Sequence, residues 1–159
     1  MQKALPHIQL YLRAAIGIGF IVPGLDRLGV WGGYGQPGIS WGDWQHFMQY
    51  AADVMQFLPY TIARLFAIIA TAAEIAFGFM LVAGLFTRLA AIGSGLLTLC
   101  FGSAMAISHG IVNPLSYSVF TVSGAGFLLA CVKRYKFSMD EWFFGNRKDP
   151  VPKEVLGEL

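Results

Sequence analysis

Charged residues are scarce in this sequence. Only 13% of its 159 residues are Asp, Glu, Lys or Arg, whereas 56% are hydrophobic. A soluble domain of this length needs more polar side chains to cover its surface, so the composition predicts an integral membrane protein. The net charge of +2 is small, and the basic residues stand at the ends of apolar segments rather than along one face. We therefore expect no nucleic-acid partner.

Cysteine and the common catalytic motifs are also nearly absent. The two cysteines, Cys100 and Cys131, form no CxxC pair. They belong at membrane depths about ten ångströms or more apart, too far for a disulfide, and are expected to be buried small apolar residues. The sequence contains no phosphate-binding loop, no GxSxG and no HExxH. It therefore carries no self-contained catalytic set.

The three histidines give little support to a haem or a metal. His7 stands at the inner end of the first apolar stretch, so only His46 and His109 belong on the same side of a membrane. Neither falls in the middle of a helix opposite a partner at the same depth, as two axial haem ligands would. Two histidines without a third ligand make a weak zinc site. We predict no metal and disfavour haem.

Four apolar stretches are long enough to cross a bilayer, which takes about 20 helical residues. They run over residues 7–28, 60–86, 89–108 and 115–132. We therefore predict an all-α, integral membrane four-helix bundle over residues 1–136, followed by a cytoplasmic interfacial helix and tail over residues 137–159. The tail helix is expected after Ser138, because Ser138-Met139-Asp140-Glu141 has the pattern of a capping box.

Basic residues predict the orientation. Residues 30–59 hold no Lys or Arg, and neither do residues 109–114. The opposite ends of the stretches carry the basic residues Lys3, Arg13, Arg88, Lys133, Arg134 and Lys136. Both termini are therefore predicted to be cytoplasmic.

The first loop contains an amphipathic pattern over residues 41–57. Apolar residues recur there with helical spacing, from Trp44 to Leu58, and Ser40 is the expected N-cap. The favoured interpretation is an interfacial helix that only packs. The alternative is a lid over the bundle, which would carry Trp44 and His46.

Ionisable residues at membrane depth are candidates for function, because an unpaired charge there is costly. Glu74 is the ionisable residue nearest the middle of the membrane. It has either a proton-handling role or a structural role. Asp26, Arg27, Arg64 and His109 belong in the outer leaflet, where they would line a polar cavity under the loop helix. We expect Asp26 to pair with Arg64 or Arg27. For Arg27 alone, the favoured interpretation is a surface charge that reaches the headgroups.

Two further arginines belong near the inner surface. Arg13 lies within the inner third of the first stretch, and Arg88 lies in the turn before the third. Both are expected to be structural and to reach lipid phosphates by snorkelling.

The ordered motifs of this chain resemble the DoxX family. Arg13 and Gly17 precede Gly24-Leu25-Asp26-Arg27-Leu28, and the set continues with Ala73-Glu74-Ile75-Ala76-Phe77-Gly78 and Gly84-Leu85-Phe86-Thr87-Arg88. The resemblance covers residues 8–132, and Asp26-Arg27 replaces a more usual basic residue after a small one. It implies a bacterial or archaeal four-helix protein of the cytoplasmic membrane. It also implies a link to redox systems, since the family is named after a small subunit of thiosulfate:quinone oxidoreductase.

Three functions are compatible with these observations. The first is a membrane subunit of a quinone-linked oxidoreductase of sulfur compounds, or an accessory to one, with quinone as the cofactor and another membrane or soluble redox subunit as the partner. Glu74 would then handle the proton. The second is a non-enzymatic anchor or assembly partner, and the third is a small-molecule carrier. A homo-oligomer is compatible with each of them.

Overall fold

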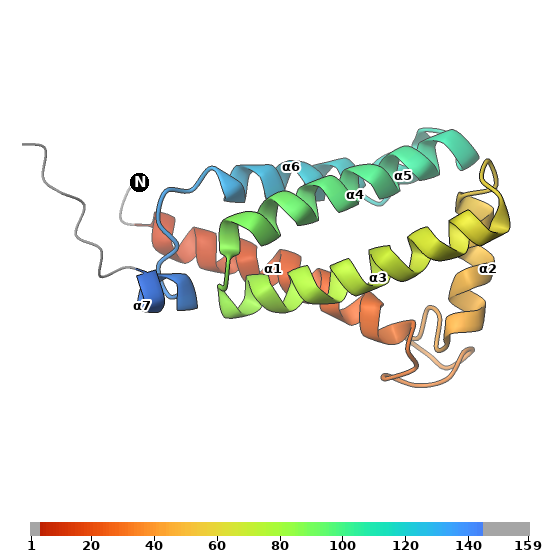
Figure 1. Cartoon of the computed structure of the whole chain (residues 1–159), viewed down its shortest axis with the longest axis horizontal. Helices are drawn as coiled ribbons and strands as arrows, with labels where there is room; N and C mark the ends of the chain where they lie inside the picture. The colour runs from red at the N-terminus through yellow and green to blue at the C-terminus, as the bar shows by residue number, and fades with distance from the viewer. Residues whose placement is uncertain (1–3, 145–159) are drawn as a thin grey trace, which may run out of the picture.

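The computed structural model describes residues 4–144, and every regular element in that range is a helix. The elements are α1 (Leu5–Asp26), α2 (Trp44–Val54), α3 (Tyr60–Ala83), α4 (Thr87–His109), α5 (Val112–Ser116), α6 (Val119–Ala130) and α7 (Met139–Phe144). Helices α1, α3, α4 and α6 run along one long axis (Figure 1). Helix α2 lies across one end of the bundle, and the start of α1 and α7 lie at the other. We call these ends the α2 end and the α7 end.

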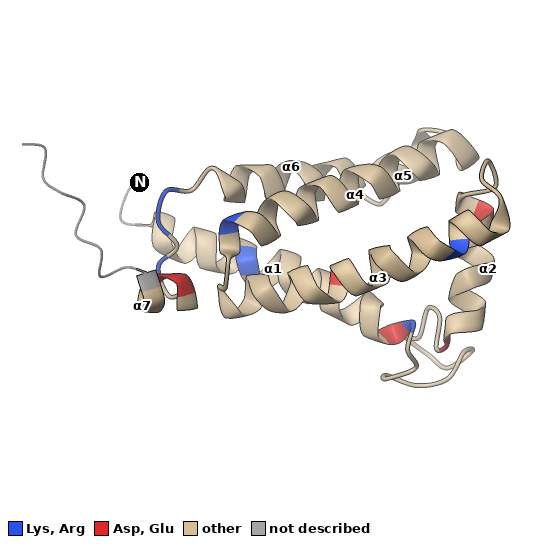
Figure 2. Cartoon of the chain, in the orientation of Figure 1, with Lys and Arg blue, Asp and Glu red and all other residues tan. Residues whose placement is uncertain are grey.

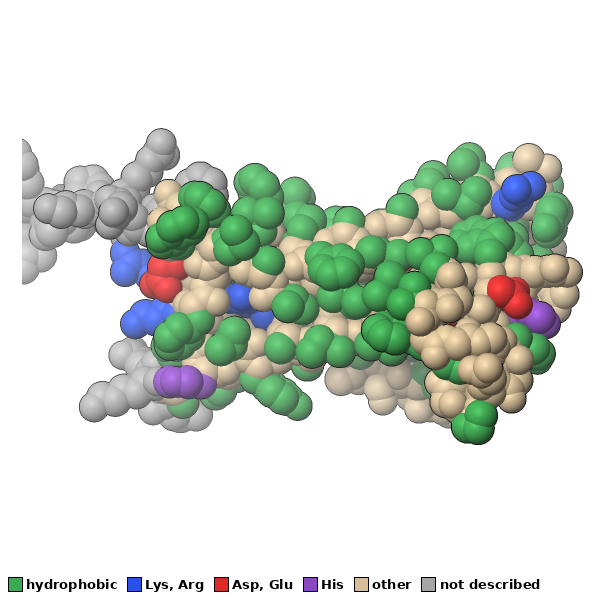
Figure 3. All heavy atoms as spheres, turned by 90° about the horizontal axis from the view of Figure 1, so that it is seen from below, with side chains coloured by type: hydrophobic (Ala, Val, Ile, Leu, Met, Phe, Trp, Pro, Cys, Tyr) green, Lys and Arg blue, Asp and Glu red, His purple; other side chains and the backbone are tan. Residues whose placement is uncertain are grey.

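Three of the described helices, α1, α3 and α4, are long and apolar enough to cross a membrane. Their outer faces carry exposed Ile, Leu, Phe and Val side chains such as Ile18, Leu65, Ile69 and Leu96. Figure 3 shows hydrophobic side chains along the flank, with most charged side chains toward the two ends. This is the distribution expected of a protein whose flank faces lipid.

The fourth predicted span is interrupted. Instead of one helix over residues 115–132, the chain forms α5, a break at Tyr117 and Ser118, and the 12-residue α6. Ser118 has a left-handed backbone (φ 55°), which an α-helix cannot continue through. Helix α6 alone is shorter than the span predicted for this segment.

The helices approach closely through glycines. A Cβ added to Gly17 of α1 or Gly78 of α3 would lie 2.8–2.9 Å from the other residue's carbonyl oxygen. On the other side of the bundle, a Cβ on Gly126 of α6 would lie 3.0 Å from Ala91 O of α4. Ser123 of α6 also donates a hydrogen bond of 2.7 Å to the carbonyl of Gly95. The pairs α1–α3 and α4–α6 therefore pack backbone against backbone, as small residues allow in membranes.

Helix α2 is shorter than the predicted 41–57 and has a different cap. Gly42 has φ +66°, and Asp43, not Ser40, is the N-cap: its carboxylate accepts a 2.8 Å hydrogen bond from His46 N. The buried face of α2, formed by Phe47, Met48 and Ala51, packs on Ala67 of α3. The loop helix therefore lies against the bundle at its α2 end.

Both cysteines differ from the expectation that they are buried. Cys100 and Cys131 are free and exposed. An exposed cysteine side chain on an apolar helix flank meets lipid without a polar cost, so exposure here is compatible with a packing role alone.

Candidate functional site

A buried ion pair joins α1 to the middle of α3. Arg27 directly follows the last residue of α1, and its Nη1 lies 2.5 Å from Glu74 Oε2. The Arg27 and Glu74 side chains are only 8% and 6% exposed. Glu74 lies on the buried stripe of α3 that also contains Ala67, Thr71 and Gly78, so the helix directs its carboxylate inward.

The guanidinium of Arg27 has further partners on two helices. Its Nη1 donates a 2.9 Å hydrogen bond to Thr71 Oγ1, one turn before Glu74 on α3. Its Cζ lies 4.2 Å from the centroid of the Phe47 ring of α2, within the range of a cation–π interaction. Arg27 Nε is buried and has no hydrogen-bond partner among the described residues. The Nε donor of the buried Arg27 guanidinium is therefore available to bind a further group.

This location differs from the expectation for Arg27. Snorkelling to the headgroups would leave the side chain exposed, but the residue is 7% exposed and paired. Helix α2 packs over Arg27, and this packing could not be predicted from the sequence alone. Arg27 therefore belongs to the interior of the protein.

Asp26 does not pair with Arg27 or Arg64, and that expectation was wrong. Its Oδ2 instead accepts hydrogen bonds from the backbone amides of Ser40 and Trp41, at 3.1 and 2.9 Å. Asp26 is 5% exposed, and its Oδ1 has no partner among the described residues. The carboxylate ties the loop before α2 to the end of α1, and so holds α2 over Arg27.

Each of the two histidines at the α2 end contacts a different carboxylate. His46 Nδ1 lies 2.7 Å from Asp43 Oδ2, and the ring stacks on Tyr34 with centroids 3.6 Å apart. The hydrogen bond from the His46 backbone amide lowers the pKa of Asp43 below its usual value. These contacts fix the first turn of α2.

His109 contacts the other end of the same helix. Its Nε2 lies 2.7 Å from Asp53 Oδ2, and Ser108 Oγ donates a hydrogen bond to the carbonyl of Val54. The end of α4 is thereby joined to α2. His46 and His109 therefore hold α2 in place instead of converging on one ligand, and the described residues contain no group of three or more metal-ligating side chains.

Of the two remaining predicted residues at the α2 end, Trp44 lies near the pair and Arg64 lies apart from it. Trp44 is half-buried, and its ring lies 5.3 Å from that of Phe47, the residue stacked on Arg27. Arg64 is exposed and lies near the start of α3, which Figure 1 shows at the α2 end. Of the predicted set, the structure brings Arg27, Glu74 and the α2 aromatic residues together, and leaves Arg64 outside.

Among the residues that the structure describes, Arg13 is the most deeply buried cation at the α7 end. It is 1% exposed, and its donors go to backbone carbonyls: Nε to Leu81 at 3.0 Å, and the Nη groups to Val82, Lys136 and Phe137 at 3.3–3.4 Å. The expectation that it reaches lipid phosphate was wrong. Arg13 instead joins α1 to the end of α3 and to the segment before α7.

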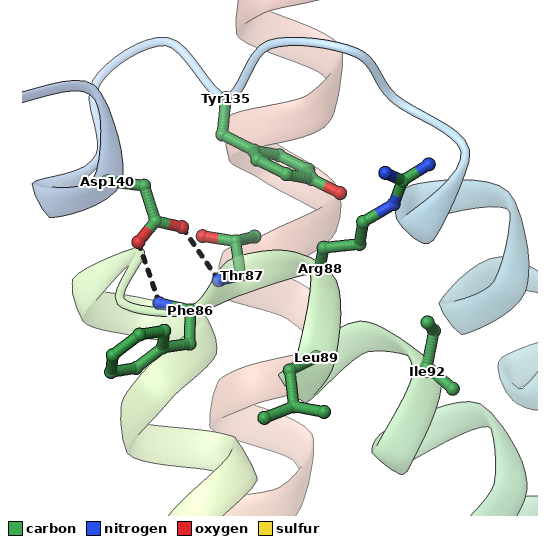
Figure 4. A pocket seen from close by; sticks show the side chains of 7 residues that line it. All are labelled: Phe86, Thr87, Arg88, Leu89, Ile92, Tyr135 and Asp140. Atoms are coloured by element: carbon green, nitrogen blue, oxygen red, sulfur yellow. Dashed lines mark hydrogen bonds between the residues drawn. The ribbon is translucent and has the colours of Figure 1, made fainter. Parts of the chain in front are cut away.

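Asp140 has a role that the sequence did not reveal. Its two carboxylate oxygens accept hydrogen bonds of 2.7 Å from the amides of Phe86 and Thr87, at the start of α4 (Figure 4). Helix α4 has no cap from its own preceding side chain. A carboxylate from over fifty positions downstream therefore satisfies its first amides and complements the helix dipole.

Comparison with known families identifies the chain. The sequence profile of the DoxX family matches residues 8–110. The chain belongs to the DoxX family. DoxX proteins are membrane proteins that are often linked to redox systems. Comparison with curated proteins and with solved structures gives no match.

The DoxX match covers the buried arginines at both ends of the bundle, but not Lys136 and Phe137, which accept hydrogen bonds from Arg13. Arg13, Arg27, Glu74 and Arg88 all lie within residues 8–110. Thr71 and Phe47 were missed as partners of the pair, although each had a weak signal. Thr71 precedes Glu74 by one helical turn, and Phe47 lies on the apolar stripe of the loop helix.

Proposed function

We propose that this DoxX protein is a four-crossing membrane subunit of a redox system, and that Arg27 and Glu74 form the polar end of a quinone site beneath α2. The observation that carries the proposal is the buried Arg27–Glu74 pair, in which Arg27 Nε has no hydrogen-bond partner among residues 4–144. Charges inside a membrane protein are costly and are commonly kept for function.

The fourth crossing is supplied by α5 and α6 together. Residues 112–130 run beside α4, which packs closely on α6. The start of α1 and α7 lie at the same end of the bundle (Figure 1), as an even number of crossings requires. Figure 2 shows Lys and Arg positions at that end, and the described basic residues Arg13, Arg88, Lys133 and Lys136 belong to the first half of α1, the start of α4 and the segment before α7. The positive-inside rule therefore favours a cytoplasmic location for this end.

The chemistry of the pair suits a neutral ligand better than an oxyanion. Glu74 already neutralises Arg27, and Nη1 is committed to Glu74 and Thr71. An anion such as thiosulfate would have to displace the carboxylate. A quinone carbonyl needs only one donor, which Arg27 Nε offers, and its reduction to a hydroxyl needs a proton, which Glu74 can relay.

Aromatic side chains at the same place suit a flat ring. Phe47 contacts Arg27, and Trp41 and Trp44 lie 5.7 and 5.3 Å from Phe47 between ring centroids. Aromatic rings of this kind stack on a planar ligand. Because the chain carries no complete catalytic set, the electrons come from a partner subunit, and this chain binds and positions the quinone.

The test is the quinone content of the protein purified from its native membrane in mild detergent. The unaltered chain is expected to retain quinone, and Glu74→Gln to lose it. Glu141→Gln, the same change at the α7 end, is the matched control and should retain quinone. A chain that retains no quinone but carries a stable partner protein would contradict the proposal and support the anchor function.

A further inference from the structure

A surface groove at the α7 end lies between the start of α4 and the segment before α7. Its lining residues are Phe86, Thr87, Arg88, Leu89, Ile92, Tyr135 and Asp140 (Figure 4). Its volume is about 410 Å³, and the lining combines one cation with several apolar side chains. None of these residues belongs to the Arg27–Glu74 site.

Polar and apolar groups are separated along the groove. In Figure 4 the guanidinium of Arg88 lies on the same side as the Tyr135 hydroxyl, and the side chains of Leu89 and Ile92 lie on the opposite side. Leu89 and Ile92 are 62% and 39% exposed. Ile92 lies one helical turn beyond Arg88 toward the middle of α4, so the apolar part of the groove continues along the apolar flank.

Arg88 is held in place without being neutralised. Its Nε donates a 3.1 Å hydrogen bond to the carbonyl of Ala130, at the end of α6. The Tyr135 hydroxyl donates to the carbonyl of Leu129 at 3.1 Å, which fixes the ring beside it. No carboxylate forms an ion pair with Arg88 among the described residues, and its Nη groups have no hydrogen-bond partner there.

The acidic residues near the groove are already engaged. Both oxygens of Asp140 accept backbone amides of α4, and Glu141 Oε2 accepts the amide of Phe137 at 3.0 Å. The exposed basic residues Lys133 and Lys136 lie in the same segment as Tyr135. The described part of the rim is therefore positive on balance.

We propose that this groove binds one anionic phospholipid of the cytoplasmic leaflet, with its phosphate on the guanidinium of Arg88 and an acyl chain along Leu89 and Ile92. The arginine fork bonds two phosphate oxygens at once, and the neighbouring lysines attract the negative headgroup. The apolar side continues directly into the hydrocarbon layer. The lipid joins α4, α6 and the segment before α7.

Lipid binding to the full chain in detergent micelles tests this, read by native mass spectrometry. Dioleoyl phosphatidylglycerol is expected to bind about tenfold or more tightly than dioleoyl phosphatidylcholine, because the choline cation of the second lipid cancels the phosphate charge that Arg88 attracts. Arg88→Gln should abolish the difference, whereas Arg64→Gln, the same change at the α2 end, should leave it intact. Glycerol phosphate, which lacks acyl chains, should not compete at equal concentration.

Two results would overturn the site. One is equal binding of the two lipids by the unaltered chain, and the other is an equal loss of preference in Arg64→Gln and Arg88→Gln. Competition by glycerol phosphate would instead indicate a free-phosphate site and would also contradict the proposal.

Photolabelling of the unaltered chain covers the case in which Arg88→Gln fails to fold. Phosphatidylglycerol with a diazirine on its acyl chain is expected to label residues 86–92 preferentially. Labelling spread evenly over the apolar flank would contradict a defined site.

Discussion

Nη1 of Arg27 lies 2.5 Å from Oε2 of Glu74, and the two side chains are 8% and 6% exposed. The contact joins residues 47 positions apart, from the end of α1 and the middle of α3. Phe47 of α2 covers its outer side. The charge pair therefore depends on three helices at once, and several measurable consequences follow from its burial.

Removing one partner of the pair should be costly. Glu74→Gln leaves the Arg27 charge buried without a counter-ion, and we expect the free energy of unfolding to fall by about 3–5 kcal/mol. The double variant Arg27→Met/Glu74→Leu removes both charges and keeps similar volume, so it should recover most of that loss. Unfolding by SDS in mixed micelles measures both. A double variant less stable than Glu74→Gln would show that the pair is not the source of the loss.

The close contact of α1 and α3 should not tolerate a side chain. A Cβ on Gly78 would lie 2.7 Å from Ile21 Cγ1 and 2.9 Å from Gly17 O. Gly78→Ala is therefore expected to destabilise the protein by about 1–3 kcal/mol through overpacking. Gly19→Ala and Gly124→Ala are matched controls, because nothing lies within 4 Å of a Cβ at either position. Thermal unfolding in detergent compares the three, and equal melting temperatures would contradict the packing described.

Asp140 should control the start of α4. Asp140→Ala removes both acceptors of the Phe86 and Thr87 amides and is expected to cost about 0.5–2 kcal/mol, the range of lost helix caps. Asp140→Asn keeps one acceptor and should have a smaller effect. Hydrogen exchange of the Phe86 and Thr87 amides gives the readout. Unchanged exchange in Asp140→Ala would show that these amides do not depend on Asp140.

The first turn of α2 should loosen in acid. The bond from the His46 amide lowers the pKa of Asp43 in the folded protein, so the carboxylate contributes stability above its unfolded pKa of about 3.9. That contribution is lost as the pH falls below about 4 and the group is protonated. Amide exchange of His46 between pH 6 and 3 should therefore show lost protection, after correction for intrinsic rates. Asp43→Asn should remove the pH dependence, and a dependence that persists in this variant would assign it to another group.

The sequence was sufficient for the parts of the fold that hydropathy determines. The apolar stretches of the sequence predicted the bounds of α1, α3 and α4 to within a few residues. The amphipathic pattern of the first loop predicted α2. The break at Ser118 was missed, because a left-handed serine has no signal in a hydrophobic pattern. The cap of α4 was missed for another reason: its acceptor, Asp140, is remote in sequence.

The candidate site was predicted in part. Glu74 was identified from its depth alone, since a carboxylate in the middle of an apolar helix is unusual. Arg27 was interpreted as a surface charge, because its burial depends on α2, which packs over it from a different part of the chain. Asp26 was assigned the wrong partners, since hydrogen bonds to loop amides cannot be inferred from residue types.

The proposed quinone site consists of the Arg27–Glu74 pair beneath α2. Photolabelling of the full chain in its membrane with an azido-quinone, followed by peptide mapping, tests whether quinone binds there. We expect the label on peptides containing Phe47 and Thr71, and we expect excess unlabelled quinone to prevent it. The Arg27→Met/Glu74→Leu variant should remain folded and lose the label. Labelling that is absent from both peptides, or that persists at full strength in the double variant, would contradict the proposed quinone site.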